Sequence, residues 1–124
     1  MPQYALLIYE TGDPDWSTLD TPEKKEAMAG YGEFGATAAA VIRGGAALYP
    51  TATSTTVQRR GGPSGDVVTS DGPFSETKEV LTGFYQVECS DLDEAVGWAS
   101  RIPAAWSGGK VEVRPIIDFG STGA

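Results

Sequence analysis

One segment, from Asp71 to Glu79, holds most of the side chains that could do chemistry. A carboxylate in a water-poor cleft can have its pKa raised toward neutrality and then act as a general acid or base. Asp71 and Glu76 are therefore the candidate catalytic residues. The ammonium group of Lys78 and the ring of Phe74 occur in the same segment and are candidates for ligand binding.

The same residues also have a structural interpretation, which is the simpler one. Aspartate before glycine and proline accepts backbone N–H bonds and holds a turn, so Asp71 needs no ligand to explain it. The charges at Glu76, Lys78 and Glu79 fit a solvated turn, because exposed ion pairs contribute only about 0–1 kcal/mol. Alternatively, these charges surround a polar ligand.

Three residues outside this segment are further candidates for ligand contact. Arg114 stands in an expected strand. It could bind a carboxylate through both guanidinium nitrogens, or pair with an acidic residue across the sheet. Tyr9 and Tyr31 are interpreted mainly as core or interface aromatics, and they complete the set of ligand-binding candidates.

The sequence contains no histidine and a single cysteine, Cys89. This composition excludes Ser-His-Asp and Cys-His nucleophilic sites and histidine-based zinc and iron sites. We therefore expect no metal and no cofactor, and any acid–base chemistry is left to Asp, Glu, Lys, Tyr or Cys89. Cys89 stands at a strand end and is expected to be a small buried hydrophobe.

Length and charge limit the organisation of the chain and its partners. The 124 residues fit one domain, and nine basic against seventeen acidic side chains give a net charge of −8. This excess of acid argues against nucleic acid and anionic membranes, which require clustered Lys and Arg. No apolar run approaches the ~18 residues of a membrane span, no signal peptide is visible, and a lone cysteine requires no oxidising compartment. We expect a soluble, cytoplasmic protein.

The elements that must position these residues begin with a strand at Gln3–Glu10, whose two faces are both apolar. A helix starts at Thr21, a hydroxyl N-cap that is followed by Pro22 at the first helical position. Its apolar face recurs in steps of three and four up to Val41. The pair Gly44–Gly45 is expected to end this helix.

Further strands and a second helix complete the expected order. Ser90 is expected to open the second helix, and Pro103 marks its end. Two strands joined by a glycine-rich loop indicate a β-hairpin. The expected strands after the first helix are 46–49, 53–60, 66–70, 83–89 and 111–114. This order predicts an α+β protein with a ferredoxin-like split βαβ pattern and a β-hairpin insertion.

The sequence of Asp71–Glu79, Asp-Gly-Pro-Phe-Ser-Glu-Thr-Lys-Glu, resembles the motif that names the DGPF group of YCII-related proteins. Its flanks agree with the family as well: residues 4–9, 83–85, 90–103 and 111–115 resemble the opening strand, the strand after the motif, the second helix and the final strand. The resemblance covers one domain, residues 1–117. It leaves 118–124 as a tail that is expected to be disordered.

The resemblance implies a dimeric α+β barrel, in which the sheets of two ferredoxin-like subunits pack together and leave a cleft at their interface. Relatives in the wider superfamily include isomerases, monooxygenases and a dehydrochlorinase, and DGPF proteins are often encoded beside extracytoplasmic-function sigma factors. The YCII branch is associated with a His–Asp pair. This chain has no histidine, so the pair cannot be carried over, and Asp71 is the residue that could correspond to its acidic half.

Two functions are open alternatives. The first, favoured by the absence of histidine, is a non-catalytic homodimeric module that binds a small organic ligand or serves a regulatory partner such as a sigma-factor system. The second is a cofactor-independent lyase or isomerase that uses Asp71 or Glu76 as acid or base in the inter-subunit cleft. A homodimer is expected in both cases, because two helices on one side of the sheet leave its other apolar face uncovered.

Overall fold

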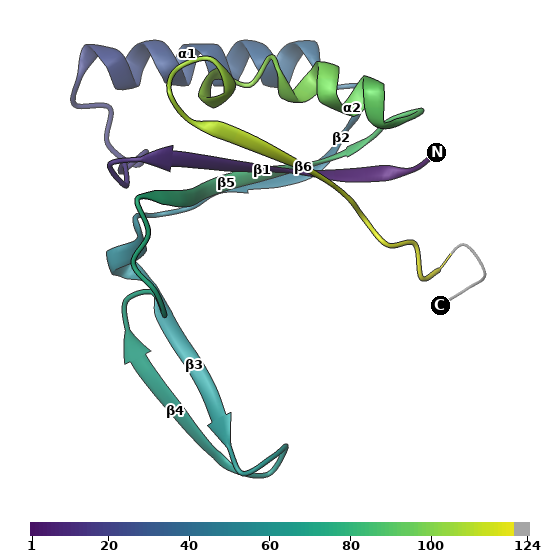
Figure 1. Ribbon diagram of the computed structural model, residues 1–124. Coiled ribbons are helices and arrows are strands. Elements are labelled where there is room, and N and C mark those ends of the chain that lie inside the picture. The colour runs from purple at the N-terminus through teal and green to yellow at the C-terminus, as the bar shows by residue number, and fades with distance from the viewer. Residues whose placement is uncertain (121–124) are drawn as a thin grey trace.

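Strand β1 (Gln3–Thr11) lies inside a four-stranded antiparallel sheet in the computed structural model, which describes residues 1–120 (Figure 1). It pairs with β5 (Glu79–Glu88) on one side and with β6 (Lys110–Pro115) on the other. β2 (Ile42–Ala47) pairs with the far side of β5, so the sheet order is β2-β5-β1-β6. One helix follows β1 and another follows β5, which confirms the expected α+β, ferredoxin-like pattern.

The alternating side chains of β1 separate the two faces of this sheet. Tyr4, Leu6 and Ile8 are buried, because α1 (Pro22–Thr37) and α2 (Leu92–Ala99) both lie on their side of the sheet (Figure 1). Burial of these apolar side chains supplies the main driving force for folding. The buried core consists of Tyr4, Leu6, Ile8, Phe34, Ala38, Val87, Cys89, Ala95, Ala99, Ile102 and Ala104.

The expected hairpin insertion is present between β2 and β5. β3 (Thr55–Arg60) and β4 (Asp66–Asp71) form a separate two-stranded antiparallel sheet. Figure 1 shows this hairpin projecting away from the body, on the side of the main sheet that carries no helix. Single turns of 3₁₀ helix precede β3 at Thr51–Thr53 and follow α2 at Pro103–Ala105.

Both helices are capped by side chains, one of them at a different residue from the one expected. Thr21 accepts a hydrogen bond from the backbone N–H of Lys24 at 3.1 Å, as the sequence predicted. The N-cap of α2 is Asp91 and not Ser90, because the Asp91 carboxylate accepts from the backbone N–H of Glu94 at 2.8 Å. Glu94 in turn accepts from the backbone N–H of Ser90, the residue before the cap, at 2.8 Å.

Helix α1 ends at Thr37, and the prediction that it continues to Val41 was wrong. Ala38 and Val41 still pack on the core, from the turn that follows the helix. The glycine pair belongs to β2 and does not terminate the helix. A Cβ atom on Gly45 would lie 2.6 Å from the carbonyl oxygen of Phe84, so glycine is required there for close pairing with β5. Neither helix, nor any other helix of residues 1–120, is long and apolar enough to cross a membrane.

The second face of the sheet is not covered by any helix of the described chain (Figure 1). Leu7 of β1 stands opposite Phe84 of β5 on this face, and Ala5 lies two residues before Leu7. All three side chains are only half-buried. Residues 116–120, which follow β6, have no regular secondary structure, and positions 121–124 of the expected tail lie outside the described residues.

Candidate ligand-binding site

A pocket of about 300 Å³ lies between α1 and the sheet, beside the edge strand β2. Met28 and Tyr31 of α1 form one wall, and Trp16 from the loop before the helix forms another. The remaining lining comes from strands of the sheet. Most of this lining is apolar, as in sites for small organic molecules. The lining residues are Ile8, Trp16, Met28, Tyr31, Gly45, Ala46, Ala47, Thr82, Gly83, Phe84 and Tyr85.

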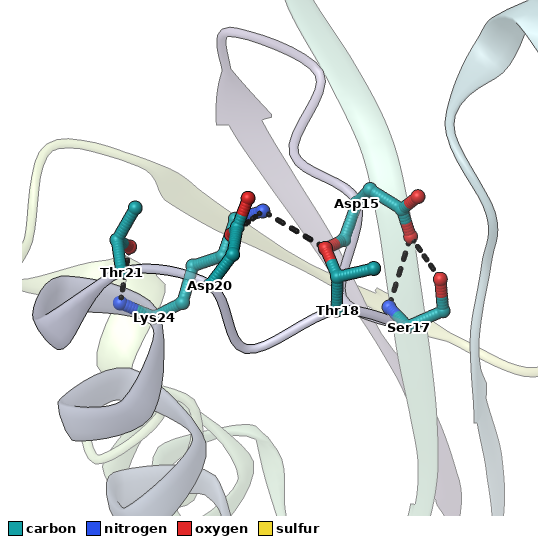
Figure 2. A network of polar contacts seen from close by, with 6 residues as sticks. All are labelled: Asp15, Ser17, Thr18, Asp20, Thr21 and Lys24. Carbon is teal, nitrogen blue, oxygen red and sulfur yellow. Dashed lines mark hydrogen bonds and ion pairs between the residues drawn. The ribbon is translucent and has the colours of Figure 1, made fainter.

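Trp16 reaches the pocket from the loop between β1 and α1, and Lys24 of α1 fixes this loop (Figure 2). The Lys24 ammonium donates to the backbone carbonyl of Asp15 at 3.1 Å and to the hydroxyl of Thr18 at 3.5 Å. It also donates to the Asp20 carboxylate at 2.9 Å. One side chain of the first helical turn therefore holds the backbone before Trp16 and two side chains that follow it.

The two carboxylates of this loop strengthen the network. Asp15 accepts from the backbone N–H of Ser17 at 2.9 Å and from its hydroxyl at 2.5 Å, and these hydrogen bonds lower the pKa of Asp15. The hydrogen bond from Lys24 lowers the pKa of Asp20. Both groups are therefore ionised at neutral pH, which is the state that accepts these bonds.

Glu10, near the end of β1, joins the loop to the helix. One of its carboxylate oxygens accepts from the indole N–H of Trp16 at 3.0 Å, and the other accepts from the Tyr31 hydroxyl at 3.3 Å. Burial and the negative charge of Glu10 raise the pKa of Tyr31. The Tyr31 phenol therefore stays protonated and remains a hydrogen-bond donor at neutral pH.

The wall formed by Tyr85 is fixed by aromatic packing behind it. The ring of Tyr85 lies against Phe34 of α1, with ring centroids 5.0 Å apart. Phe34 meets Trp98 of α2 edge-on, with a centroid distance of 6.4 Å. Burial raises the pKa of Tyr85, so this phenol is also neutral at physiological pH. This wall of the pocket is thus supported by aromatic side chains of both helices.

The Asp71–Glu79 segment borders a second, larger hollow of about 710 Å³, on a different part of the molecule. Asp13 and Thr51 also line this hollow. They are joined by hydrogen bonds from the Thr51 backbone N–H at 3.1 Å and the Thr51 hydroxyl at 2.5 Å to the Asp13 carboxylate. The hollow is lined by Tyr9, Gly12, Asp13, Thr51, Ala52, Pro73, Phe74, Ser75, Glu76, Thr77, Lys78, Glu79, Val80 and Leu81.

Four of the seven candidate residues from the sequence line this second hollow. The ring of Phe74 is 88% exposed, so it forms a wall of the hollow and not part of the core. Glu76 and Lys78 are exposed as well. The fourth residue, Tyr9, comes from β1 and is half-buried.

The other three candidates lie elsewhere, so the structure does not gather all seven in one site. Tyr31 lines the pocket beside Trp16. Asp71 is the exposed last residue of β4. Arg114 is exposed on β6, where its guanidinium donates to the carboxylate of Glu112 at 2.6 Å, and this partner stands on the same strand.

Cys89 is fully buried, as expected. Burial raises the pKa of its thiol, which makes this side chain a poor nucleophile at neutral pH. Within residues 1–120, no group of three or more Cys, Asp or Glu side chains is arranged to hold a metal ion. The expectation that the protein uses no metal stays a prediction.

Sequence reasoning missed most of the pocket between α1 and the sheet. Glu10, Trp16 and Met28 were not among the candidates. The available signal was Trp16 itself, because a large aromatic residue in a loop with Gly12 and Pro14 is a common sign of a binding loop. Nothing in the spacing of the sequence connects Glu10 with this tryptophan.

Two comparisons with known proteins each match most of the chain. The family model of the YCII-related domain matches residues 3–120. An uncharacterised protein of Rhizobium meliloti (strain 1021) is 34% identical over 119 residues, an alignment that covers 91% of this chain and 90% of that protein.

Proposed function

The chain belongs to the YCII-related family, and we propose that it is a non-catalytic, homodimeric module that binds a small organic ligand in the pocket between α1 and the sheet. The observation that carries this proposal is the construction of that pocket. Its walls are aromatic and aliphatic, and its volume of about 300 Å³ suits a small molecule. Such a module would serve as a ligand-dependent accessory to a regulatory system, such as the sigma-factor systems that the resemblance implies.

The chemistry of the lining favours binding over catalysis. The ionisable residues that line the pocket are Tyr31 and Tyr85, and both phenols stay neutral because their pKa is raised. A carboxylate base would need a water-poor cleft around it. Asp71 and Glu76 are exposed in the single chain. The lyase or isomerase alternative therefore requires a partner subunit to enclose the hollow beside Glu76.

The homodimer is supported by the uncovered face of the sheet. Ala5, Leu7 and Phe84 form an apolar centre on this face, and an antiparallel sheet with one apolar face open is stabilised when a second layer packs on it. A second copy of the chain provides a matching sheet. The expected result is a single species of twice 13.0 kDa in sedimentation at micromolar concentration, whereas a single species near 13.0 kDa would refute the dimer.

The ligand-binding proposal is tested by a thermal-shift screen of small aromatic compounds that are neutral, acidic or basic. A ligand that binds only the native state raises the melting temperature by mass action. Trp16→Ala should abolish the shift. Trp106→Ala is the matched control, because Trp106 is 66% exposed and does not line the pocket. The proposal fails if no compound shifts the melting temperature, or if the shifts of all active compounds survive in Trp16→Ala.

A further inference from the structure

Two of the side chains that line the pocket are hydrogen-bonded to one charged group, the carboxylate of Glu10. The lining of the pocket contains no Lys, Arg, Asp or Glu. The carboxylate of Glu10 lies just behind this lining, where it accepts hydrogen bonds from Trp16 and Tyr31. None of the ion pairs found among residues 1–120 involves Glu10. Both donors to this carboxylate are neutral groups, so no cation of residues 1–120 forms an ion pair with it.

We propose that the ligand of this pocket is an organic cation, a quaternary or tertiary ammonium group joined to a small apolar group, held by the rings of Trp16, Tyr31 and Tyr85 and by the charge of Glu10. This inference rests on the proposed function of the pocket as a ligand-binding site. It adds the chemical class of the ligand.

The aromatic rings supply the first part of this argument. Trp16, Tyr31 and Tyr85 all line the pocket, and the rings of Trp16 and Tyr31 are turned 69° from each other. Rings in different planes can present faces and edges to the same bound group. The π face of an aromatic ring attracts ammonium groups, and aromatic cages bind quaternary ammonium ligands in this way.

The carboxylate supplies the second part. A half-buried negative charge is stabilised by an opposite charge nearby. Lys24 holds the loop that carries Trp16, but its ammonium is bonded to Asp15, Thr18 and Asp20. An ammonium ligand would compensate Glu10, while a carboxylate or phosphate ligand would be repelled. The net charge of −8 raises the local concentration of cations, which also favours a cationic ligand.

The decisive experiment compares benzyltrimethylammonium with neopentylbenzene, its neutral isostere, in which carbon replaces the ammonium nitrogen. Both probes offer the same shape and apolar area, so a difference in affinity reports the charge. We expect the cation to bind the wild-type protein at least about tenfold more tightly, as measured by calorimetry and thermal shift.

Two variants locate the source of this preference. Glu10→Gln keeps a side-chain acceptor and removes the charge, so it should weaken binding of the cation by about tenfold and leave the neutral probe unchanged. Glu33→Gln removes one charge from the exposed side of α1 and should change neither affinity. If Glu10→Gln does not fold, the two affinities of the wild-type protein at increasing salt concentration take its place. Only the affinity for the cation should then fall, and equal behaviour of both probes would overturn the role of charge.

The outcomes separate this inference from the proposed function. If the neutral probe binds as tightly as the cation and Trp16→Ala abolishes both, the pocket binds ligands but the cationic class is wrong. The inference is also overturned if neither probe binds, or if Glu10→Gln leaves the affinity for the cation unchanged. The proposed function itself is decided by the broader screen and its dependence on Trp16.

Discussion

Trp16 and Tyr31 meet edge to face, with ring centroids 6.0 Å apart and an interplanar angle of 69°. One ring comes from a loop and the other from helix α1. Both side chains also donate to the same carboxylate, Glu10 of β1. Three segments are thus joined at one end of the pocket, and the position of the indole depends on how firmly the loop is held.

The first prediction concerns the hydrogen bonds by which Lys24 holds this loop. Lys24→Ala removes the hydrogen bonds to Asp15, Thr18 and Asp20 (Figure 2), so we expect Trp16 to become more mobile and ligand-induced stabilisation to fall. The ligand-free melting temperature should fall only slightly, because Asp20, the charged partner of Lys24, is 64% exposed. Mobility can be read by ¹⁹F NMR of protein labelled with 5-fluorotryptophan.

Lys25→Ala is the control, because Lys25 is the next residue of the same helix and is exposed. It removes the same charge without touching the loop network. The expected result is a broadened or shifted Trp16 resonance in Lys24→Ala alone. Equal spectra for the two variants would show that Lys24 does not hold the loop.

Two phenylalanines of opposite exposure give the second prediction. Phe34 is 3% exposed and packs between Tyr85 and Trp98, so Phe34→Ala should lower the free energy of unfolding by about 3–5 kcal/mol. Phe74 is 88% exposed, and Phe74→Ala should change it by no more than about 0.5 kcal/mol. Urea denaturation of both variants measures the difference. A large loss in Phe74→Ala would mean that its ring is buried in solution, for example by a partner subunit.

The order of the elements could be predicted because each one carries a local signal. The short apolar run of β1 and the Thr21-Pro22 start of α1 are each visible in a few neighbouring residues. The end of α1 could not be predicted in the same way. A pair of glycines fits a helix terminus and also fits a strand that needs close pairing, and only the contact of Gly45 with β5 distinguishes the two.

The pocket was harder to predict than the fold. Trp16 and Tyr31 lie 6 and 21 positions after Glu10 in the chain. The three residues meet only because α1 folds back over β1. The Asp71–Glu79 segment could be identified as a candidate from the sequence because its polar residues lie close together in the chain. Adjacent residues are visible without a structure, whereas a site assembled from distant segments requires the tertiary contacts.

The third prediction concerns pH and Glu94. Hydrogen bonds from the backbone N–H and the hydroxyl of Ser90, and then from the indole of Trp98, lower the pKa of Glu94 in the folded state. A carboxyl group with a lowered folded pKa contributes stability above its unfolded pKa of about 4.3. That contribution is lost as the pH falls through the lower folded value.

Melting curves from pH 7 to pH 3 test this expectation. Glu94→Gln should melt below the wild type at neutral pH, and the gap should narrow as the pH falls. Glu33→Gln provides the control for removing one carboxylate from an exposed helical position. A gap that stays constant over the whole pH range would assign the effect of Glu94→Gln to something other than its ionisation.

The last prediction concerns the charges at Glu76 and Lys78. In the described part of the chain, neither side chain forms an ion pair or a side-chain hydrogen bond, although both line the second hollow. The ion pair of Glu79 with Lys110 and the Thr77 hydroxyl bond to the Glu79 carbonyl anchor the end of the segment instead. We therefore expect Glu76→Ala and Lys78→Ala to shift the ligand-free melting temperature by only a few degrees.

Ligand binding should respond more strongly than folding if this segment forms a wall of the inter-subunit cleft. Any ligand held in the second hollow should lose its stabilising effect in Glu76→Ala and Lys78→Ala and keep it in Trp16→Ala. A ligand of the pocket between α1 and the sheet should show the reverse dependence, because Trp16 lines that pocket and the two charged residues do not. Thermal shifts of the three variants with every active compound of the screen make the comparison. If all active compounds depend on Trp16 and none on Glu76 or Lys78, the segment does not bind ligand, and its charges serve only as a solvated turn.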